Sequence, residues 1–342
     1  MQPIWITSLC IALTLCIVAT DAQSTQSKIN KAKSPYIAAS SWPDRIIVTP
    51  TENPATSFSI TWRTDQTIEA PQAQIVKASA DERFDLEAKS QTATTQNVSL
   101  SHGESPHGKI RYPANAHLPA VNYHGVTLTD LQPDTLYNYR VSGEPGNWTP
   151  WRQIKTAPQQ RNSDVEFLYF GDAQNGIYSH WPMILHRAWQ HAPKAEFAIY
   201  AGDLVNEGAS DRQWSNWLNA DPFILSMIPA VLVVGNHEYD WKMQANNQKD
   251  WALSTLWQDQ FTLPLSPTLP VELQETVYVT RYPDLDIFVL NSGALGDVAL
   301  LDAQAQWLDK KLQSSSAKWR IVTMHHPVFS SCGMPLNTAG QD

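Results

Sequence analysis

The chain carries, at residues 196–208, the stretch EFAIYAGDLVNEG, in which an apolar run leads through Gly202 directly to Asp203. A carboxylate at the end of a buried strand is costly unless a partner compensates its charge. Glycine just before it lets the chain turn sharply and approach a ligand closely. The same pattern occurs in VEFLYFGDAQ (165–174) and PAVLVVGNHE (229–238). Three strands that end alike predict one shared site rather than three unrelated turns.

The stretches around these three indicate an α/β domain. Two further compact apolar runs, DIFVLN (286–291) and KWRIVTM (318–324), have the length of buried strands. Helical stretches lie between the runs, and strand–helix alternation is typical of a largely parallel sheet. One such stretch, LDAQAQWLDKKL, predicts a helix whose buried face carries Leu301, Ala305, Leu308 and Leu312.

The half of the chain that precedes this domain has a different pattern of apolar and polar residues. SFSITWR alternates Phe58, Ile60 and Trp62 with polar residues, which predicts a strand with one face inward. Short strands of this kind between Pro, Asn, Asp and Gly clusters indicate an antiparallel β-sandwich over residues 41–157. We expect the histidines of this half to be exposed to solvent: His102, His107, His117 and His124.

LQPDTLYNYRV, residues 131–141, resembles the L-x-P-x-T-x-Y signature of fibronectin type III domains. The resemblance implies a fibronectin type III-like sandwich, in which Tyr137 is the corner tyrosine whose hydroxyl bonds to nearby backbone. We interpret this domain as a spacer or recognition wall, since it offers no cluster of metal-ligating residues.

Composition limits the function classes. The formal net charge is −9 and no basic cluster is visible, which argues against binding to a nucleic-acid backbone.

Residues 1–22 are apolar and then polar, and predict a secretory signal peptide, so that no stable membrane span remains after cleavage. A membrane anchor is the alternative. Residues 23–40 predict a flexible leader. We therefore expect a secreted, periplasmic or extracellular protein.

Ligands in open α/β sheets bind beyond the carboxyl ends of the strands. By this rule we expect the residues that follow the apolar runs to lie close together, namely Asp172, Asp203, Asn236, His237, His325 and His326. Carboxylate, amide and imidazole donors together suit zinc, iron or manganese. A bridging carboxylate can hold two such ions roughly 3.5–4 Å apart. The pattern predicts a dinuclear metal centre that binds phosphate.

The motifs GDAQ, GDLVNEG, GNHE and VTMHHP occur in the order used by calcineurin-like metallophosphoesterases. Together with the fibronectin-like domain, they resemble the purple acid phosphatase branch of that superfamily. The resemblance implies an α/β metallophosphoesterase domain over residues 163–342. It also implies two metal ions and hydrolysis of phosphate esters by in-line attack of a metal-bound hydroxide. The substrate class is then a phosphate-ester small molecule or a phosphoprotein.

The resemblance assigns a role to each motif residue. Asp172 binds the first metal, Asp203 bridges both, and Asn236 and His325 bind the second. His237 binds the phosphate or donates a proton to the leaving group. His326 faces the substrate without binding metal. The residues that orient the ligands are Glu238 and Gln174.

Two departures from the family pattern qualify these expectations. The purple enzymes place tyrosine three residues after the bridging aspartate, where this chain has Asn206. The purple colour is therefore not expected, and iron(II), manganese or zinc is favoured. A later G-H-x-H pair does not occur before Asp342, and a truncated domain is the expectation. Cys332, the one cysteine outside the predicted signal peptide, is expected to be either a small buried apolar side chain or the partner of a cysteine beyond that end.

Other interpretations stay open. A degraded phosphoesterase fold in an exported, non-catalytic binding or adhesion protein is one alternative. A phosphodiesterase or nucleotidase of the same superfamily is the other. The substrate depends on loops such as GIYSHWPM and YDWKMQANNQKDW, whose aromatic residues either stack on an aryl or nucleobase group or pack loop against loop.

Overall fold

The computed structural model describes residues 36–105, 108–160, 164–244, 246–294 and 297–329. These residues belong to one compact unit, Pro35–Asp342. The predicted signal peptide, most of the predicted leader, His107 and Cys332 lie outside the described residues and stay predictions. Within the described ranges, no helix has the length and apolar character needed to cross a membrane.

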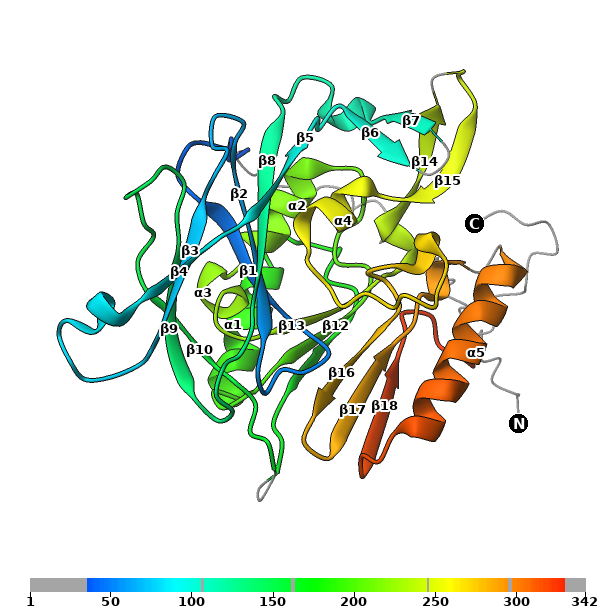
Figure 1. The fold of residues 1–342 in the computed structure, drawn as a ribbon. Coiled ribbons are helices and arrows are strands. Elements are labelled where there is room, and N and C mark those ends of the chain that lie inside the picture. The colour runs from blue at the N-terminus through cyan, green and yellow to red at the C-terminus, as the bar shows by residue number, and fades with distance from the viewer. Residues whose placement is uncertain (1–35, 106–107, 161–163, 245, 295–296, 330–342) are drawn as a thin grey trace, which may run out of the picture. The chain divides into compact units, whose positions relative to one another are not determined.

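Residues 44–155 form the predicted sandwich of two antiparallel sheets (Figure 1). Phe58, Ile60 and Trp62 are buried in its core, as their alternation predicts. The Tyr137 hydroxyl accepts a hydrogen bond from the Gln132 backbone N–H at 2.8 Å, which is the corner contact that the resemblance implies. One sheet has the order β1(Asp44–Pro50), β2(Phe58–Asp65), β8(Val121–Leu128), β5(Thr94–Val98), and the other β10(Arg152–Lys155), β9(Leu136–Val141), β3(Gln72–Lys77), β4(Lys89–Thr92).

The polar face of β2 is buried as well, which alternation alone does not predict. Thr61 and Arg63 are at most 3 % exposed, because the second half of the chain covers this face. The Thr61 hydroxyl donates to Thr262 at 3.2 Å across that contact.

The expectation of an exposed His124 is wrong. Its ring is fully buried between Thr64 at 2.7 Å and Thr95 at 3.0 Å. Burial lowers the pKa of His124 to about 4, so the ring is neutral at physiological pH.

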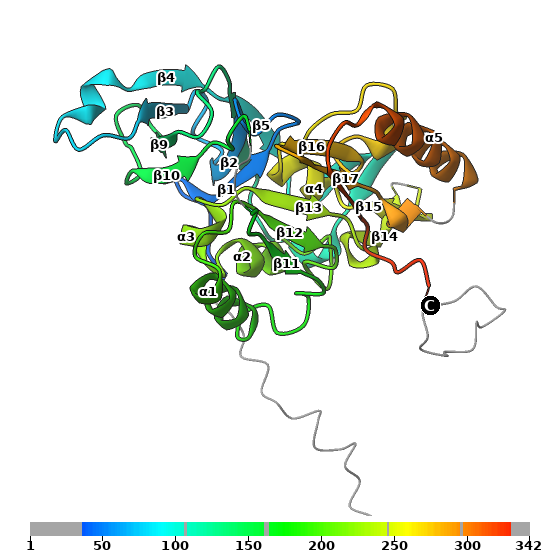
Figure 2. The same cartoon turned by 90° about the horizontal axis from the view of Figure 1, so that it is seen from below.

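The α/β half contains two three-stranded sheets rather than the single sheet expected from the sequence. The first is fully parallel, and Figure 2 shows helices α1 and α2 against it. In the second, one strand pair is antiparallel and the other parallel. The first sheet contains β11(Leu168–Phe170), β12(Ala198–Ala201) and β13(Ala230–Val233). Helix α1(Trp181–His191) connects β11 to β12, and α2(Asp211–Leu218) lies between β12 and β13 in the chain. The second sheet contains β16(Tyr278–Tyr282), β17(Leu285–Val289) and β18(Trp319–Thr323).

A fifth sheet joins strands from both halves of the chain. Met243 and Gln244 pair with Arg111 and Ile110, so the hairpin after the GNHE motif extends a hairpin of the sandwich half. The sheet has the order β15(Lys249–Leu253), β14(Tyr239–Gln244), β7(Gly108–Arg111), β6(His102–Ser105). The remaining helices are α3(Pro222–Leu225), α4(Thr255–Gln260) and α5(Val298–Ser314), with short 3₁₀ turns η2(Phe84–Glu87), η3(Pro113–Asn115), η4(Asn236–Glu238), η5(Val271–Leu273) and η6(Ser292–Ala294).

Helix α5 is where the sequence predicts it, beside the second sheet in Figure 1, but its buried face is rotated. Gln304 and Trp307 are buried, whereas Ala305 of the predicted face is exposed. Gln304 tolerates burial because its amide exchanges two hydrogen bonds with the Asn291 backbone, at 2.8 and 3.1 Å. Trp307 packs on Phe288 of β17 at 6.5 Å between ring centroids.

A buried ion pair connects the sandwich to the α/β half. The Arg45 guanidinium donates to both Asp211 oxygens, at 2.7 and 2.9 Å, and neither side chain is exposed. Arg63 lies 3.6 Å from the same carboxylate, and the Tyr36 hydroxyl donates to it at 2.9 Å. The attraction of Asp211 to two buried cations keeps its pKa below the ordinary value, although burial acts in the opposite direction.

Candidate metal centre

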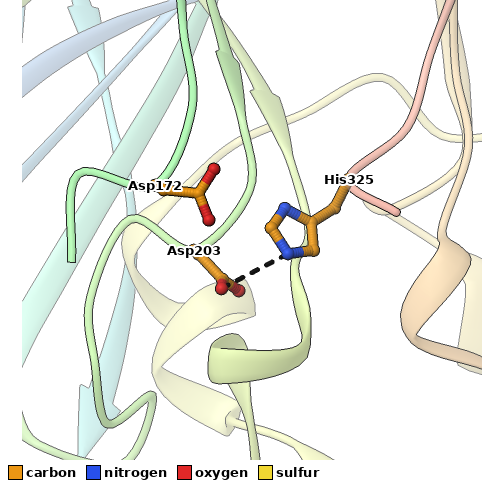
Figure 3. A group of neighbouring side chains, drawn as sticks. All are labelled: Asp172, Asp203 and His325. Carbon is orange, nitrogen blue, oxygen red and sulfur yellow. Dashed lines mark ion pairs between the residues drawn. The ribbon is translucent and has the colours of Figure 1, made fainter. Parts of the chain in front are cut away.

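Three of the predicted ligands meet at the carboxyl ends of their strands. Asp172 follows β11, Asp203 follows β12, and His325 follows β18 (Figure 3). One ligand atom from each lies within 4.8 Å of the others. The two sheets therefore contribute to one centre, as the strand-end argument predicts.

The backbone at both aspartates has an uncommon conformation. Asp172 and Asp203 have φ values of 54° and 51°, in the left-handed region that few residues other than glycine adopt. Aspartate is one of the side chains that tolerate it. This turn aims each carboxylate back across the ends of the strands. Such local strain is often found at functional sites.

Two of the three glycines that precede the candidate ligands, Gly202 and Gly235, leave no space for a side chain. Gly202 has φ +86°, and an added Cβ would lie 2.7 Å from the His325 ring. At Gly235 the added Cβ would lie 2.2 Å from Asp203 Oδ1 and 2.4 Å from its backbone nitrogen. The two glycines thus let three ligand-bearing segments come into contact.

His325 is held in the orientation of a metal ligand. Its Nδ1 lies 2.9 Å from the Ala201 carbonyl oxygen, which fixes that nitrogen as the donor. Its Nε2 then faces Asp203 Oδ2 at 3.3 Å and Asn236 Oδ1 at 3.1 Å. A ligating histidine commonly donates its other ring N–H to a carbonyl in this way. The amide oxygen of Asn236 therefore lies next to the His325 ring, beside the three candidate ligands.

The charges of the centre suit a cation. Burial lowers the pKa of His325, but the Asp203 carboxylate and the Ala201 carbonyl outweigh it and raise that pKa to about 9. Burial raises the pKa of Asp203, but hydrogen bonds from His325 and the His237 backbone hold it below the usual value. The surroundings of His325 thus favour a positive charge next to the Asp203 carboxylate. The donor set of carboxylates, amide and imidazole fits iron, zinc or manganese.

Glu238 organises the backbone around the centre. It is fully buried, and its carboxylate accepts hydrogen bonds from the N–H groups of Asp203 at 2.9 Å, Leu204 at 2.8 Å and Gly235 at 2.7 Å. Burial raises the pKa of Glu238 to about 7, against the effect of these donors. Gln174 donates to Asp203 Oδ2 at 3.0 Å. The two residues expected to orient the ligands therefore both contact the Asp203 segment.

His237 lies at the open side of the centre. Its backbone N–H donates to Asp203 Oδ1 at 3.0 Å, and its ring Nδ1 lies 2.8 Å from the Asn206 carbonyl oxygen. The ring Nε2 is 3.9 Å from Asp203 Oδ2, and about a third of the side chain is exposed. The backbone of Asn206 thus positions this histidine, a role that its side-chain identity does not reveal in the sequence.

His326 is fixed by a residue that the sequence does not indicate. Ser292 Oγ accepts the His326 backbone N–H at 3.0 Å and lies 2.9 Å from its ring Nδ1. Burial and the neighbouring His325 lower the pKa of His326. Its ring packs edge-on against that of His325, with centroids 4.9 Å apart. No motif surrounds Ser292, so only the fold identifies it.

Comparison with known proteins agrees with the fold of the two halves of the chain. Residues 43–156 match the family model of the purple acid phosphatase N-terminal domain, and residues 165–339 match that of calcineurin-like phosphoesterases. No curated protein sequence matches the chain.

Two solved structures show the same fold at low identity. A purple acid phosphatase, PPD1, from yellow lupin (Lupinus luteus) seeds is 16% identical with a TM-score of 0.62, over 82% of this chain and 50% of that one. PhoD is 15% identical with a TM-score of 0.54, over 84% of this chain and 63% of that one. The chain thus spans between half and two thirds of these relatives. On the strength of the family match, the chain belongs to the calcineurin-like phosphoesterases and carries an N-terminal domain of the purple acid phosphatase type.

Proposed function

We propose that this protein hydrolyses phosphate esters at a dinuclear metal centre. The observation that carries the proposal is the convergence of Asp172, Asp203 and His325, whose ligand atoms lie within 4.8 Å. In this assignment Asp172 binds one ion, Asp203 bridges both, and Asn236 and His325 bind the other. The family match supports the reaction class, since it names phosphoesterases.

Bound metal ions would supply positive charge for the phosphate and would lower the pKa of water at the centre. The chain's own residues orient the reactants. Gln174 and Glu238 hold Asp203 so that both carboxylate oxygens remain aimed at the centre. Ligands fixed before the substrate arrives do not reorganise during the reaction, which lowers its barrier.

His237 is the proposed proton donor to the leaving group. Its Nδ1 faces the Asn206 carbonyl at 2.8 Å, so that nitrogen holds a proton. The exposed Nε2 can then donate only when the ring is doubly protonated.

Asn206 supports a metal pair different from that of the purple enzymes. Asn206 follows Asp203 by three residues. It contacts His237 through its backbone carbonyl, and its side chain offers no phenolate to a metal ion. Because no tyrosine oxygen is available at this position, we propose that iron(II), manganese or zinc occupies both metal positions.

The proposal is tested with the full chain and an aryl phosphate. Metal content is measured before and after chelation, and hydrolysis is followed as each metal is restored. We expect about two ions per chain and activity that disappears with chelation and returns with metal. Metal binding without hydrolysis of monoesters or diesters would instead favour the non-catalytic binding protein.

A further inference from the structure

Strands β14 and β15 present three aromatic side chains on one face next to the candidate centre. Trp241 and Trp251 lie directly opposite each other in the antiparallel pair, and Tyr239 is two residues before Trp241. Side chains two residues apart on a strand share a face. The Tyr239 and Trp251 rings are stacked at 6.1 Å, and those of Trp241 and Trp251 lie 5.3 Å apart. We call these three residues the aromatic wall.

The aromatic wall is attached to the segment that holds His326. The Tyr239 hydroxyl accepts a hydrogen bond from the Asn291 amide at 2.9 Å. Its ring lies so close to Gly293 that an added Cβ would be 2.6 Å from Tyr239 Cε2. Ser292, between these two residues, contacts His326. The inner end of the wall is therefore fixed at the rim of the centre.

The outer end of the wall faces solvent. Trp241 is 61 % exposed and Trp251 is 42 % exposed, although both are large apolar side chains. Tyr239 follows His237 by two residues, and Trp241 lies about 7 Å further along the strand. The wall therefore begins two residues from His237 and ends in exposed aromatic rings.

We propose that the aromatic wall is a subsite for the planar base of a nucleoside leaving group, and that the preferred esters are nucleoside monophosphates. This inference rests on the proposed function for its phosphate site. Because the aromatic wall adjoins the rim of the centre, we infer that its occupant is a part of the substrate. Bases stack on aromatic side chains without a requirement for particular hydrogen bonds. In a nucleoside monophosphate the ribose separates the base from the phosphate, so that the two groups would occupy neighbouring subsites.

Two esters with the same reacting group test the subsite. Adenosine 5′-monophosphate and ribose 5-phosphate both release a primary 5′ hydroxyl, and they differ at C1′, which carries adenine in the first and a hydroxyl in the second. Removal of one stacking ring costs about 1–3 kcal/mol per base, and about 1.4 kcal/mol corresponds to tenfold. Trp241→Ala is therefore expected to lower the ratio of their kcat/KM values about tenfold, through adenosine 5′-monophosphate alone. Trp241→Phe, which keeps a ring, is expected to restore most of the ratio.

Trp319→Ala is the matched control, since Trp319 is 63 % exposed and begins the strand whose other end leads to His325. It is expected to leave the ratio unchanged. Equal ratios in the wild type and in the Trp241 and Trp319 variants would overturn the proposal.

A binding measurement separates the subsite from the reaction. Calorimetric titration with adenosine, which has no phosphate, is expected to give a dissociation constant about tenfold weaker in Trp241→Ala than in the wild type. If neither ester is hydrolysed, the proposed function fails while this titration still decides the subsite. Adenosine that does not bind the wild type, or that binds both proteins equally, contradicts the subsite.

Discussion

The carboxylate of Glu238 accepts the backbone N–H of Asp203 at 2.9 Å, so that one buried acid fixes the position of another. The same carboxylate holds Gly235, which precedes the ligand Asn236. One side chain thus ties together two of the strand ends that supply the candidate centre. Its loss would affect the fold and the centre at once.

Glu238→Gln tests this tie. Glutamine replaces one acceptor oxygen with an NH₂ group that faces backbone donors, which leaves buried N–H groups without partners. We expect the free energy of unfolding to fall by about 2 to 4 kcal/mol in urea titrations. Glu207→Gln is the control, because the Glu207 side chain is exposed on the loop that follows Asp203. Equal stability of the two variants would show that the hydrogen bonds of Glu238 do not contribute to the free energy of unfolding.

Gly235→Ala tests the space between the ligands. The new methyl group would meet Asp203 Oδ1 at 2.2 Å and would displace that carboxylate. We expect most bound metal to be lost while the far-ultraviolet circular dichroism is kept. The control is Gly171→Ala, whose added Cβ has no atom within 4 Å although the residue also precedes a ligand. Normal metal content in the Gly235 variant would refute the packing argument.

Asp211→Ala tests the link between the halves of the chain. The substitution leaves Arg45 buried without its carboxylate partner, and removal of one member of a buried pair costs about 3–5 kcal/mol. Asp134→Ala removes an exposed partner from Lys155, and we expect a cost of at most about 1 kcal/mol. Thermal unfolding measures both. Similar Tm values for the two variants would contradict the role of burial.

Asp259→Asn tests a buried carboxyl in a polar cavity of about 500 Å³ between the two halves. Burial and the charge of Glu275 raise the pKa of Asp259 to about 7. Since the folded pKa lies above the unfolded value, about 3.9, its contribution to stability is complete below pH 4 and is lost as pH rises through 7. Asparagine does not ionise and can still accept the Gln96 hydrogen bond.

We therefore expect Asp259→Asn to gain stability relative to the wild type by about 2 to 4 kcal/mol between pH 4 and pH 8. Urea unfolding at several pH values measures this difference. Parallel stability curves for the two proteins would show that Asp259 titrates normally in the fold.

The sequence predicted the strand ends well because their signal is local. A buried apolar run followed by glycine and a polar residue, as at Gly202 and Asp203, is specified within ten residues of chain. The burial of Arg63 was not predictable, since it lies on a sandwich face that the second half of the chain covers. His124 pairs with Trp62 and is buried on the opposite face, inside the sandwich. An alternating pattern indicates which face packs within one domain, and it carries no information on a neighbouring domain.

The hairpin β14–β15 was missed for a related reason. Its strands are polar and aromatic, and β14 pairs with β7, more than a hundred residues earlier in the chain. Ser292 contacts His326 only because the second sheet brings their segments together. Contacts of this kind depend on the assembled sheets and leave no local pattern in the sequence.

Metal content of Asp203→Asn is the most direct test of the central claim, which is that Asp203 bridges two ions. Asparagine keeps the left-handed backbone but has one oxygen fewer to share. The matched control is Asp284→Asn, at another left-handed aspartate with φ 58°. The account predicts about two ions per chain in the wild type and the control, and less than one in Asp203→Asn. Two ions in the Asp203 variant, with normal hydrolysis of an aryl phosphate, would contradict it.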